Sequence, residues 1–294
     1  MSPRHLAILL MVAVMCLWGS TFVVTKATFD EIPPLTLAFL RVSIGALVLA
    51  PFALHRWRQS SQPLPWGAIL QLGFIGVAFY YLTFNLGMSR TSASQGALVQ
   101  SCIPAMTALV AVVFLRERAS RLRLIGIALS IAGVLVIFSG AASDPSGASV
   151  FGNAMVFLSV IAWGFYTSIA KRVLEHDSVV VTACIVGCGA VLLLPAAAFE
   201  LSSAPFPSLS AQGWFGVLYL GTLASGIAFL VYNYALRYME AGQAGVFANL
   251  IPVVGVLSGI VVLHEPLSWR SIAGGVVVMA GVWITGSERA AVAV

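Results

Sequence analysis

The chain has 294 residues, of which 60% are hydrophobic and only 9% are charged, and its mean hydropathy is +1.00. This composition leaves too little polar surface to cover a globule in water, so it excludes an ordinary soluble domain. The net charge of +5 does not favour a nucleic-acid partner, because the 15 lysines and arginines fall in short clusters between apolar runs. We therefore expect the lipid bilayer as the environment and no nucleic acid as a partner.

The first apolar run, residues 6–25, follows Arg4 and His5 and has features of a signal peptide or, at Cys16, of a lipoprotein cleavage site. Met15 stands where a small residue is needed before that cysteine, and the apolar run continues beyond it. We therefore interpret this run as a retained first helix. The four cysteines of the chain lie inside apolar stretches without the spacing of a disulfide framework or a zinc site, and we expect no metal or other cofactor.

Ten apolar stretches of about 20 residues, the length that crosses a hydrocarbon core of about 30 Å, follow one another along the chain. Their approximate limits are 6–25, 35–54, 66–86, 92–114, 122–139, 151–170, 179–199, 213–235, 242–263 and 269–286. Short connections containing proline, serine and aspartate separate most of them. The expected fold class is an all-α membrane protein with ten transmembrane helices.

The distribution of cations predicts the orientation. If the N-terminus is cytoplasmic, eleven lysines and arginines lie on the cytoplasmic side and three, Lys26, Arg90 and Arg270, lie outside. Arg41 remains, inside the second span. Both termini are therefore predicted to be cytoplasmic, in a multi-pass protein of the bacterial inner membrane.

The two halves of the chain are similar in sequence. Residues 66–139 align without a gap to residues 214–287 at a constant offset of 148. The matches include Trp66 with Trp214, Asn85 with Asn233, Gln95 with Gln243, Pro104 with Pro252, Glu117 with Glu265, Gly126 with Gly274 and Gly133 with Gly281. At an offset of 145, Trp18, Gly19 and Lys26 match Trp163, Gly164 and Lys171. We predict two five-helix repeats, residues 1–144 and residues 145–294.

An odd number of spans in each half predicts that the second half enters the membrane in the opposite orientation. Two inverted copies of one bundle can exchange conformations, so that a central site opens first to one side and then to the other. The sequence therefore favours alternating access, although a fold is only a prior on function.

The residues that repeat carry a resemblance to a known family. They are Trp18-Gly19-Ser20, Arg41, the stretch from Pro252 to Glu265 with Gly274 and Gly281, and its repeat from Pro104 to Glu117 with Gly126 and Gly133. With them the chain resembles the drug/metabolite transporter superfamily, specifically its EamA-type ten-helix members, and among these the amino-acid exporters, including those for aromatic amino acids. The resemblance implies export of amino acids and related metabolites. The duplication is imperfect at Arg41, whose counterpart is Val186.

Aromatic side chains inside the spans are the first candidates for a solute site. They are Trp18, Tyr80, Tyr81, Trp163, Tyr166, Phe229, Tyr232 and Tyr234. Each could instead face lipid or the membrane interface, and that alternative stays open. Trp18 and Trp163 lie well inside their spans, where aromatic walls could stack on an apolar or aromatic part of a solute.

Polar residues within the spans are the second candidates. They are Asn85, Gln100, Ser101, Asn233 and Asn249. Hydrogen bonding between helices would explain them equally well. Ser101 and Asn249 each precede a proline by three residues, at which a bend exposes backbone acceptors near the middle of the membrane.

The charged residues point more to structure than to binding. Arg41 could meet a substrate carboxylate, but a structural role, snorkelling outward or tying down backbone carbonyls, is the favoured interpretation. Lys26 and Lys171 are expected to be anchors or gate residues, and Glu117 to pair with nearby arginines. Ser120 and Ser268 are suited to cap the helices that follow them.

The sequence lacks a phosphate-binding loop, paired acids at membrane depth and a nucleophile constellation, so we expect neither ATP hydrolysis nor an enzyme. The favoured hypothesis is a facilitated transporter of amino acids and related metabolites. Its site would be lined by Trp18, Tyr81, Asn85, Ser101, Trp163 and Asn249. An exporter of drugs or lipophilic cations, a proton-coupled antiporter and a membrane-embedded enzyme are the alternatives, and the oligomeric state stays open.

Overall fold

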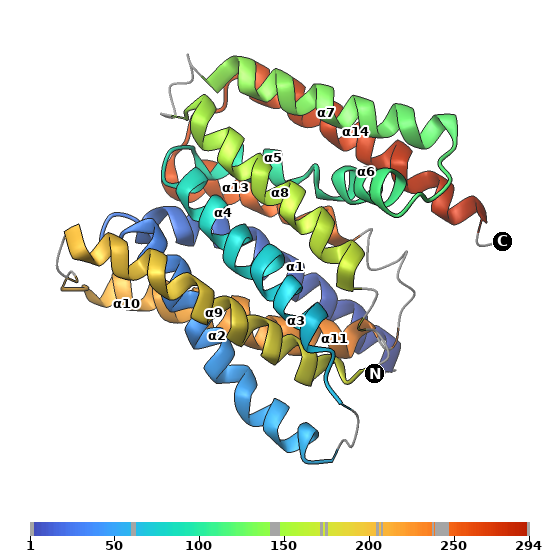
Figure 1. Cartoon of the computed structure of the whole chain (residues 1–294). Helices are drawn as coiled ribbons and strands as arrows, with labels where there is room; N and C mark the ends of the chain where they lie inside the picture. The colour runs from blue at the N-terminus through green and yellow to red at the C-terminus, as the bar shows by residue number, and fades with distance from the viewer. Residues whose placement is uncertain are drawn as a thin grey trace.

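The computed structural model describes residues 3–59, 63–141, 148–170, 173, 176–203, 206, 208–236, 238 and 247–292. Within these ranges all regular structure is helical (Figure 1). Helices are the expected solution in a bilayer, because each backbone group finds its hydrogen-bond partner inside its own segment.

The helices begin and end close to the predicted limits, except that the predicted start of the ninth span, residue 242, lies outside the described residues. In chain order they are α1 (Pro3–Thr28), α2 (Pro34–Trp57), α3 (Trp66–Leu72), η1 (Gly73–Phe79), α4 (Tyr80–Met88), α5 (Ala93–Gln100), α6 (Ile103–Phe114), α7 (Arg121–Ala141), α8 (Val150–Ala170), α9 (Ser178–Ser203), α10 (Ala211–Leu218), η3 (Tyr219–Ile227), α11 (Ala228–Leu236), α13 (Leu250–Leu263) and α14 (Trp269–Val292). In the described residues nine helical stretches are long and apolar enough to cross a bilayer, and α13 is a shorter apolar helix. The prediction of an all-α membrane protein with ten spans is confirmed.

Two spans contain a π-helical segment. The third span consists of α3, η1 and α4, and the eighth of α10, η3 and α11. Residues 73–79 of η1 correspond at the offset of 148 to residues 221–227, which lie within η3. The wider π-helical turn interrupts the regular hydrogen bonding of a helix and is frequent at functional sites.

The prolines predicted to bend the fourth and ninth spans mark real breaks. In the fourth span α5 ends at Gln100 and α6 begins at Ile103, with Pro104 in its first turn. In the ninth, α13 begins after Asn249. The caps predicted for two later helices are also present, since the hydroxyls of Ser120 and Ser268 accept hydrogen bonds from the N–H groups of residues 123 and 271 at 3.2 and 3.1 Å.

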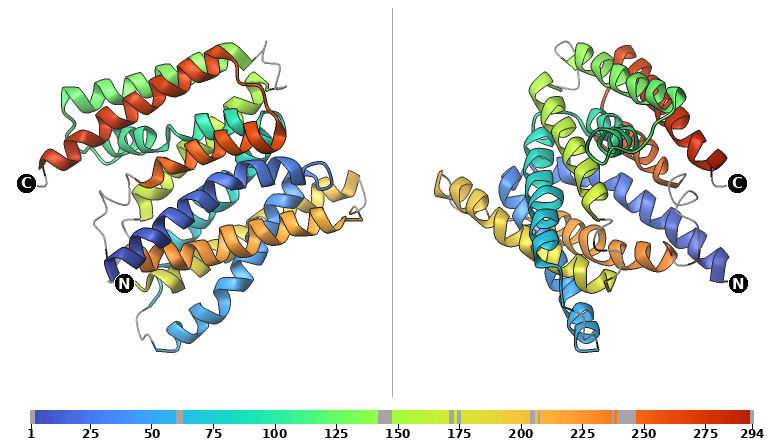
Figure 2. Two further views of the ribbon diagram at one scale, coloured as in Figure 1. Left: turned by 180° about the vertical axis from the view of Figure 1, so that it is seen from behind. Right: turned by 45° about the vertical axis from the view of Figure 1, so that its right-hand side comes forward.

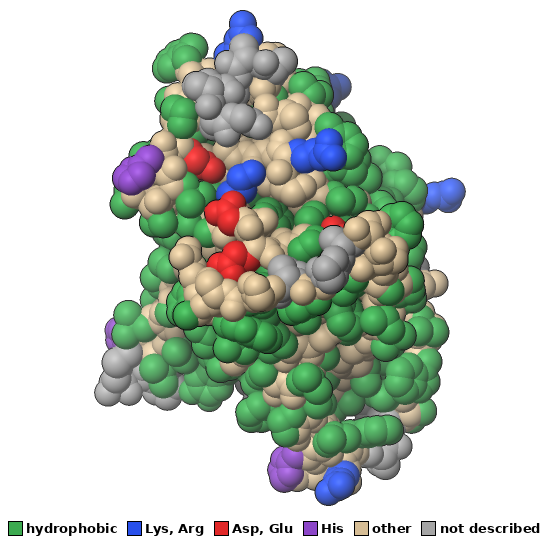
Figure 3. Space-filling model, turned by 90° about the vertical axis from the view of Figure 1, so that its left-hand side faces the viewer, with side chains coloured by type: hydrophobic (Ala, Val, Ile, Leu, Met, Phe, Trp, Pro, Cys, Tyr) green, Lys and Arg blue, Asp and Glu red, His purple; other side chains and the backbone are tan. Residues whose placement is uncertain are grey.

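The outer surface of the bundle is apolar. Large side chains such as Leu47, Phe199 and Trp283 are 72%, 75% and 74% exposed, which suits contact with lipid tails rather than water. Figure 3 shows the face of the molecule that lies on the left in Figure 1. Acidic and basic side chains are grouped on one part of this face, and hydrophobic side chains cover most of the rest. Both termini lie at the opposite end (Figures 1 and 2), as an even number of spans requires.

Helices α7 and α14 lie side by side and contact through glycines (Figure 2). A Cβ added at Gly126 would lie 2.7 Å from the carbonyl oxygen of Gly281, and one added at Gly133 would lie 2.7 Å from that of Gly274. Gly126 therefore faces Gly281, which is the counterpart of Gly133, and Gly133 faces Gly274, which is the counterpart of Gly126. Two helices related by an approximate two-fold axis would make such crosswise contacts.

The first helix of each half packs on the fourth helix of the other half. A Cβ at Gly19 of α1 would lie 2.6 Å from the Cβ of Val254 in α13, and one at Gly164 of α8 would lie 3.3 Å from the backbone of Met106 in α6. At their respective offsets these two contacts correspond to each other. The same exchange of partners is what two related halves facing each other would produce.

The close approach of α7 and α14 generates a stability prediction. Gly133→Ala should lower the unfolding free energy by about 1–3 kcal/mol, because the new methyl group collides with backbone that cannot yield easily. The matched control is Gly187→Ala in α9, where an added Cβ would meet no atom of the described chain within 4 Å. Thermal unfolding of both variants in detergent is the measurement, and equal stabilities would contradict the proposed contact.

Candidate functional site

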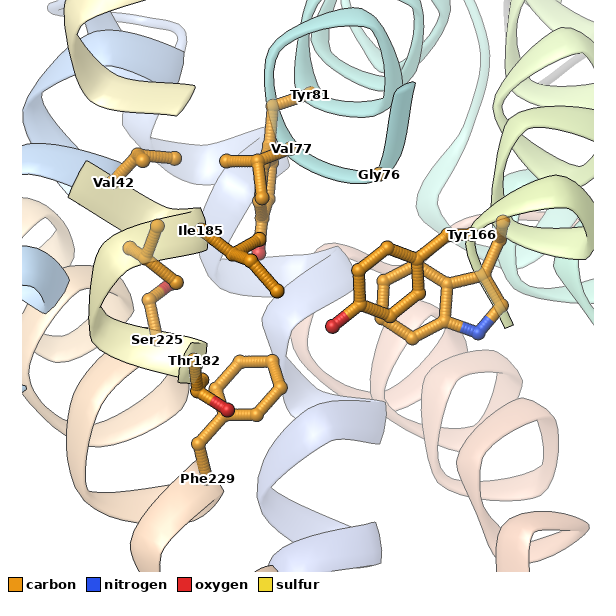
Figure 4. Close-up of a pocket in the computed structure, with 11 residues that line it drawn as sticks. Val42, Gly76, Val77, Tyr81, Tyr166, Thr182, Ile185, Ser225 and Phe229 are labelled. Carbon is orange, nitrogen blue, oxygen red and sulfur yellow. The ribbon is translucent and has the colours of Figure 1, made fainter. Parts of the chain in front are cut away.

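A cavity lies in the middle of the bundle, between helices of both halves (Figure 4). Its walls come from α2, η1 and α4 in the first half and from α8, α9, η3 and α11 in the second. The lining residues are Val42, Gly76, Val77, Tyr81, Trp163, Tyr166, Thr182, Ile185, Val186, Ser225 and Phe229. The wall is mostly aromatic and aliphatic with a few polar groups, the usual character of a small-molecule site.

The π-helical segments position the centre of this wall. Gly76 and Val77 belong to η1, and Ser225 belongs to η3. Val77 and Ser225 are counterparts at the offset of 148, as are Tyr81 and Phe229. Equivalent positions of the two halves therefore face the same space, which fits a site on the axis between them.

The cavity is small in this conformation. Its volume is about 20 Å³, which is room for about one or two water molecules. An organic solute would need the walls to move apart. A cavity between two packed halves can widen when one half rotates against the other.

Trp163 and Tyr166 form the aromatic side of the cavity. Their ring centroids lie 4.9 Å apart, and the Trp163 ring lies 5.2 Å from that of Tyr80. Figure 4 shows Tyr166 on one side of the space and Phe229 on the other. Trp163 and Tyr81, both predicted as site residues, thus line one cavity.

Trp18, the counterpart of Trp163, lies behind the opposite wall. Its ring centroid is 5.5 Å from Phe229 and 5.3 Å from Tyr232. Its indole N–H donates to the carbonyl oxygen of Ala224 in η3 at 3.0 Å. Trp18 therefore supports the cavity wall and satisfies a carbonyl of the π-helical segment, and it is not itself among the lining residues.

The predicted polar residues are not brought into the cavity wall. Asn85 is fully buried, its amide nitrogen donates to the carbonyl oxygen of Tyr81 at 2.8 Å, and its Oδ1 has no partner among the described residues. The Ser101 hydroxyl donates to the carbonyl oxygen of Leu98 at 2.6 Å. Asn249 is half-buried at the start of α13. The side chain of Asn233 lies outside the described part.

Gln100 belongs to a structural network. It shares hydrogen bonds with the Tyr80 hydroxyl and donates to the Ser159 hydroxyl at 3.1 Å, which joins α5 to α4 and α8. Asn153 of α8 extends the contacts, since its amide nitrogen donates to Gln95 at 2.6 Å and its oxygen accepts from Thr91 at 2.5 Å. These amides support the interhelical alternative rather than solute binding.

Two contacts tie α1 and the end of α13 to the connection between α4 and α5. The Lys26 ammonium donates to the carbonyl oxygens of Met88 and Thr91 at 3.2 and 2.7 Å. The Glu265 carboxylate accepts from the N–H groups of Ala93 and Ser94 at 2.7 and 2.8 Å, where it caps the N-terminus of α5. Lys26 is an anchor here, as predicted, whereas the capping role of Glu265 was missed.

Polar contacts also join connections at both ends of the bundle. Arg56 pairs with Asp177 at 2.9 Å at one end, and Ser210 donates twice to Glu31 at the other. Hydrogen bonds from Ser210 hold the pKa of the Glu31 carboxyl below its usual value. Burial alone would raise the pKa of Asp177, but the hydrogen bonds from Arg56 and from backbone N–H groups outweigh it and lower the pKa. The predicted pairing of Glu117 is present too, with Arg123 at 3.5 Å.

Arg41 differs from the structural expectation. Its side chain neither reaches the surface nor ties down carbonyls, because the residue is only 4% exposed and its Nε and Nη1 have no partner in the described chain. Its guanidinium carbon lies 4.6 Å from the centre of the Tyr81 ring. The structure therefore shows neither snorkelling to the surface nor a hydrogen bond from Nε or Nη1 to a carbonyl oxygen in the described chain.

Seven lining residues were missed by the sequence analysis: Val42, Gly76, Val77, Thr182, Ile185, Val186 and Ser225. Small and aliphatic side chains are abundant in every span, so nothing in their type marks them. The one available signal was positional, since Val186 is the counterpart of Arg41.

Comparison with known proteins gives relatives along the whole chain. An uncharacterized transporter of Archaeoglobus fulgidus is 30% identical over 273 residues, which cover 92% of this chain and 95% of the relative. The uncharacterized transporter YetK of Bacillus subtilis is 27% identical over 278 residues, 93% of this chain and 84% of the relative. A solved crystal structure superimposes with a TM-score of 0.65 over 95% of this chain and 94% of the other at 20% identity, a likeness of fold alone.

The family assignment rests on a match to both halves. The sequence model of the EamA-like transporter family matches residues 5–139 and, a second time, residues 150–287. These matches leave only short segments uncovered. The chain is a membrane transporter that belongs to the EamA-like transporter family.

Proposed function

We propose that the protein exports amino acids and related small metabolites across the bacterial inner membrane by alternating access. The solute would occupy the central cavity between two inverted repeats, residues 1–144 and 145–294. The observation that carries the proposal is the cavity wall, in which Val77 and Tyr81 face their counterparts Ser225 and Phe229. The family match to each half separately supports the two repeats.

The chemistry of the wall favours a solute with an apolar or aromatic part. Trp163, Tyr166 and Phe229 offer ring faces and edges, on which such a group can stack. An exporter of lipophilic cations would be expected to carry a carboxylate at the site, and the lining residues in the described chain include none. The amino-acid reading therefore fits better than the drug-exporter alternative.

We propose that the solute moves down its own gradient, without coupling to protons. Proton coupling needs a group whose protonation differs between the two states, which at membrane depth is usually an aspartate, glutamate or histidine. The described side chains that line the cavity include no such group. Lys26 donates to two backbone carbonyls, which favours a fixed charge over a proton carrier.

Reconstitution in liposomes tests this proposal. With equal pH on both sides, a panel of labelled amino acids should show saturable counterflow for the preferred member, because an uncoupled carrier exchanges solute without a second gradient. An imposed pH gradient should not drive accumulation above equilibrium. Accumulation that collapses with a protonophore would replace the facilitated mechanism with proton-coupled antiport, and a complete lack of counterflow would remove amino acids as the substrate class.

The aromatic wall generates a selectivity prediction. Trp163→Ala should raise the half-saturation concentration for phenylalanine about two- to tenfold and that for alanine much less, because the stacking area that is lost scales with the size of the solute. Trp283→Ala is the matched control, since that tryptophan is 74% exposed on α14. Equal losses for both solutes, measured by counterflow, would assign Trp163 to packing.

The proposed topology places both termini in the cytoplasm. Two exposed positions lie in connections at opposite ends of the bundle, Gln59 after α2 and Ser208 before α10. In a variant with the native cysteines replaced, Ser208→Cys should react with a membrane-impermeant thiol reagent in intact spheroplasts, whereas Gln59→Cys should react only after lysis. The reverse pattern would invert the orientation.

A further inference from the structure

Arg41 of α2 carries a charge that the described structure does not neutralise. The residue is 4% exposed, and its Nε and Nη1 are buried without a hydrogen-bond partner in the described ranges. Three cations near helix ends have a polar or charged partner: Lys26 donates to two carbonyls, Arg56 pairs with Asp177, and Arg123 forms an ion pair with Glu117 at 3.5 Å, although its Nε and Nη2 are buried without a hydrogen bond among the described residues. Arg41 has no carboxylate partner within the described ranges, and its guanidinium carbon lies 4.6 Å from the centre of the Tyr81 ring.

A buried guanidinium is stabilised when an anion binds to it. Arginine cannot lose its proton under any ordinary condition, so burial cannot be relieved by neutralisation, as it can for lysine or glutamate. An aromatic face offsets part of the desolvation cost, but it leaves the N–H donors unused. A buried charge of this kind is usually retained because it pairs with something, and in a transporter span that something is often the solute.

The position of Arg41 relative to the cavity is favourable. Val42, the next residue, and Tyr81, the ring beneath the guanidinium, both line the cavity. The counterpart of Arg41 in the second half is Val186, which also lines it. If the two halves exchange conformations, Arg41 takes the place at the wall that Val186 holds now. The hydroxyl of Ser225, on the opposite wall, is likewise buried without a partner in the described residues.

We propose that Arg41 is the anion-binding residue of the site and that the transported solute carries a carboxylate. The planar fork of N–H donors matches a carboxylate in a bidentate pair, while the apolar or aromatic part of the solute lies against Trp163, Tyr166 and Phe229. This inference rests on the proposed transport function and narrows its substrate class to organic acids, among them amino acids with a free carboxyl group.

Binding of a matched pair of solutes to the purified protein tests the inference. The probes are L-phenylalanine and L-phenylalaninamide, which share the ring and the amino group and differ in the carboxylate. The variants are Arg41→Gln and Arg41→Lys. The control is Arg90→Gln, because Arg90 also lies over a ring, 5.5 Å from the centre of Phe151, but is exposed. Affinities are measured by titration, and thermal unfolding is followed with and without each probe.

The unaltered protein should bind the acid at least tenfold more tightly than the amide. Arg41→Gln should lower the affinity for the acid at least tenfold and leave that for the amide within about twofold, and Arg90→Gln should change neither. Without solute, Arg41→Gln should unfold at the same temperature as the unaltered protein or higher, because the substitution removes an unpaired buried charge. A structural role would give the opposite shift in stability.

Several results would overturn the inference. Equal affinities of the unaltered protein for acid and amide would remove the role of Arg41 and leave the transport proposal standing, whereas binding of neither probe would remove the amino-acid substrate and this inference together. If Arg41→Gln does not fold, Arg41→Lys decides. A reduced preference for the acid supports the bidentate pair, and an unchanged preference overturns it.

Discussion

The need to satisfy every backbone polar group without water shapes this structure. Regular helices meet it in the spans, and the interruptions lie where side chains or other helices supply the missing partners. The indole of Trp18 donates to the carbonyl of Ala224 in η3, and the carboxylate of Glu265 accepts two N–H groups at the start of α5. The π-helical segments η1 and η3 both contribute residues to the wall of the central cavity.

The two halves are alike in packing and unlike in chemistry. Glycine contacts between α7 and α14, and between the first helix of each half and the fourth of the other, follow the pattern of related copies. The cavity wall departs from it, with Tyr81 opposite Phe229 and Val77 opposite Ser225, and with Arg41 where the second half has Val186. A symmetric scaffold can support the exchange of conformations, while an asymmetric wall can fix the orientation of one solute.

The candidate site was predictable in part, and particular residues show why. Trp163 and Tyr81 were found because large aromatic side chains well inside a span are unusual enough to stand out, and both line the cavity. Ser101 and Asn249 were correctly placed at helix breaks, yet they do not line the cavity in this conformation, because a proline fixes where a helix bends and not which way a side chain then faces. Arg41 was found as a lone cation, but its burial could not be inferred from position along a helix.

The sequence by itself determined the spans, the breaks, several caps and the similarity of the halves. These features depend on local hydropathy, proline positions and matched residues, which the bilayer constrains directly. Only the tertiary structure decided which side chains face the cavity, such as Val42 and Ile185, and that Glu265 caps a helix far away in the chain. The physical reason is that lipid and protein interior are both apolar, so no alternation of polar and apolar residues marks the inner face of a transmembrane helix.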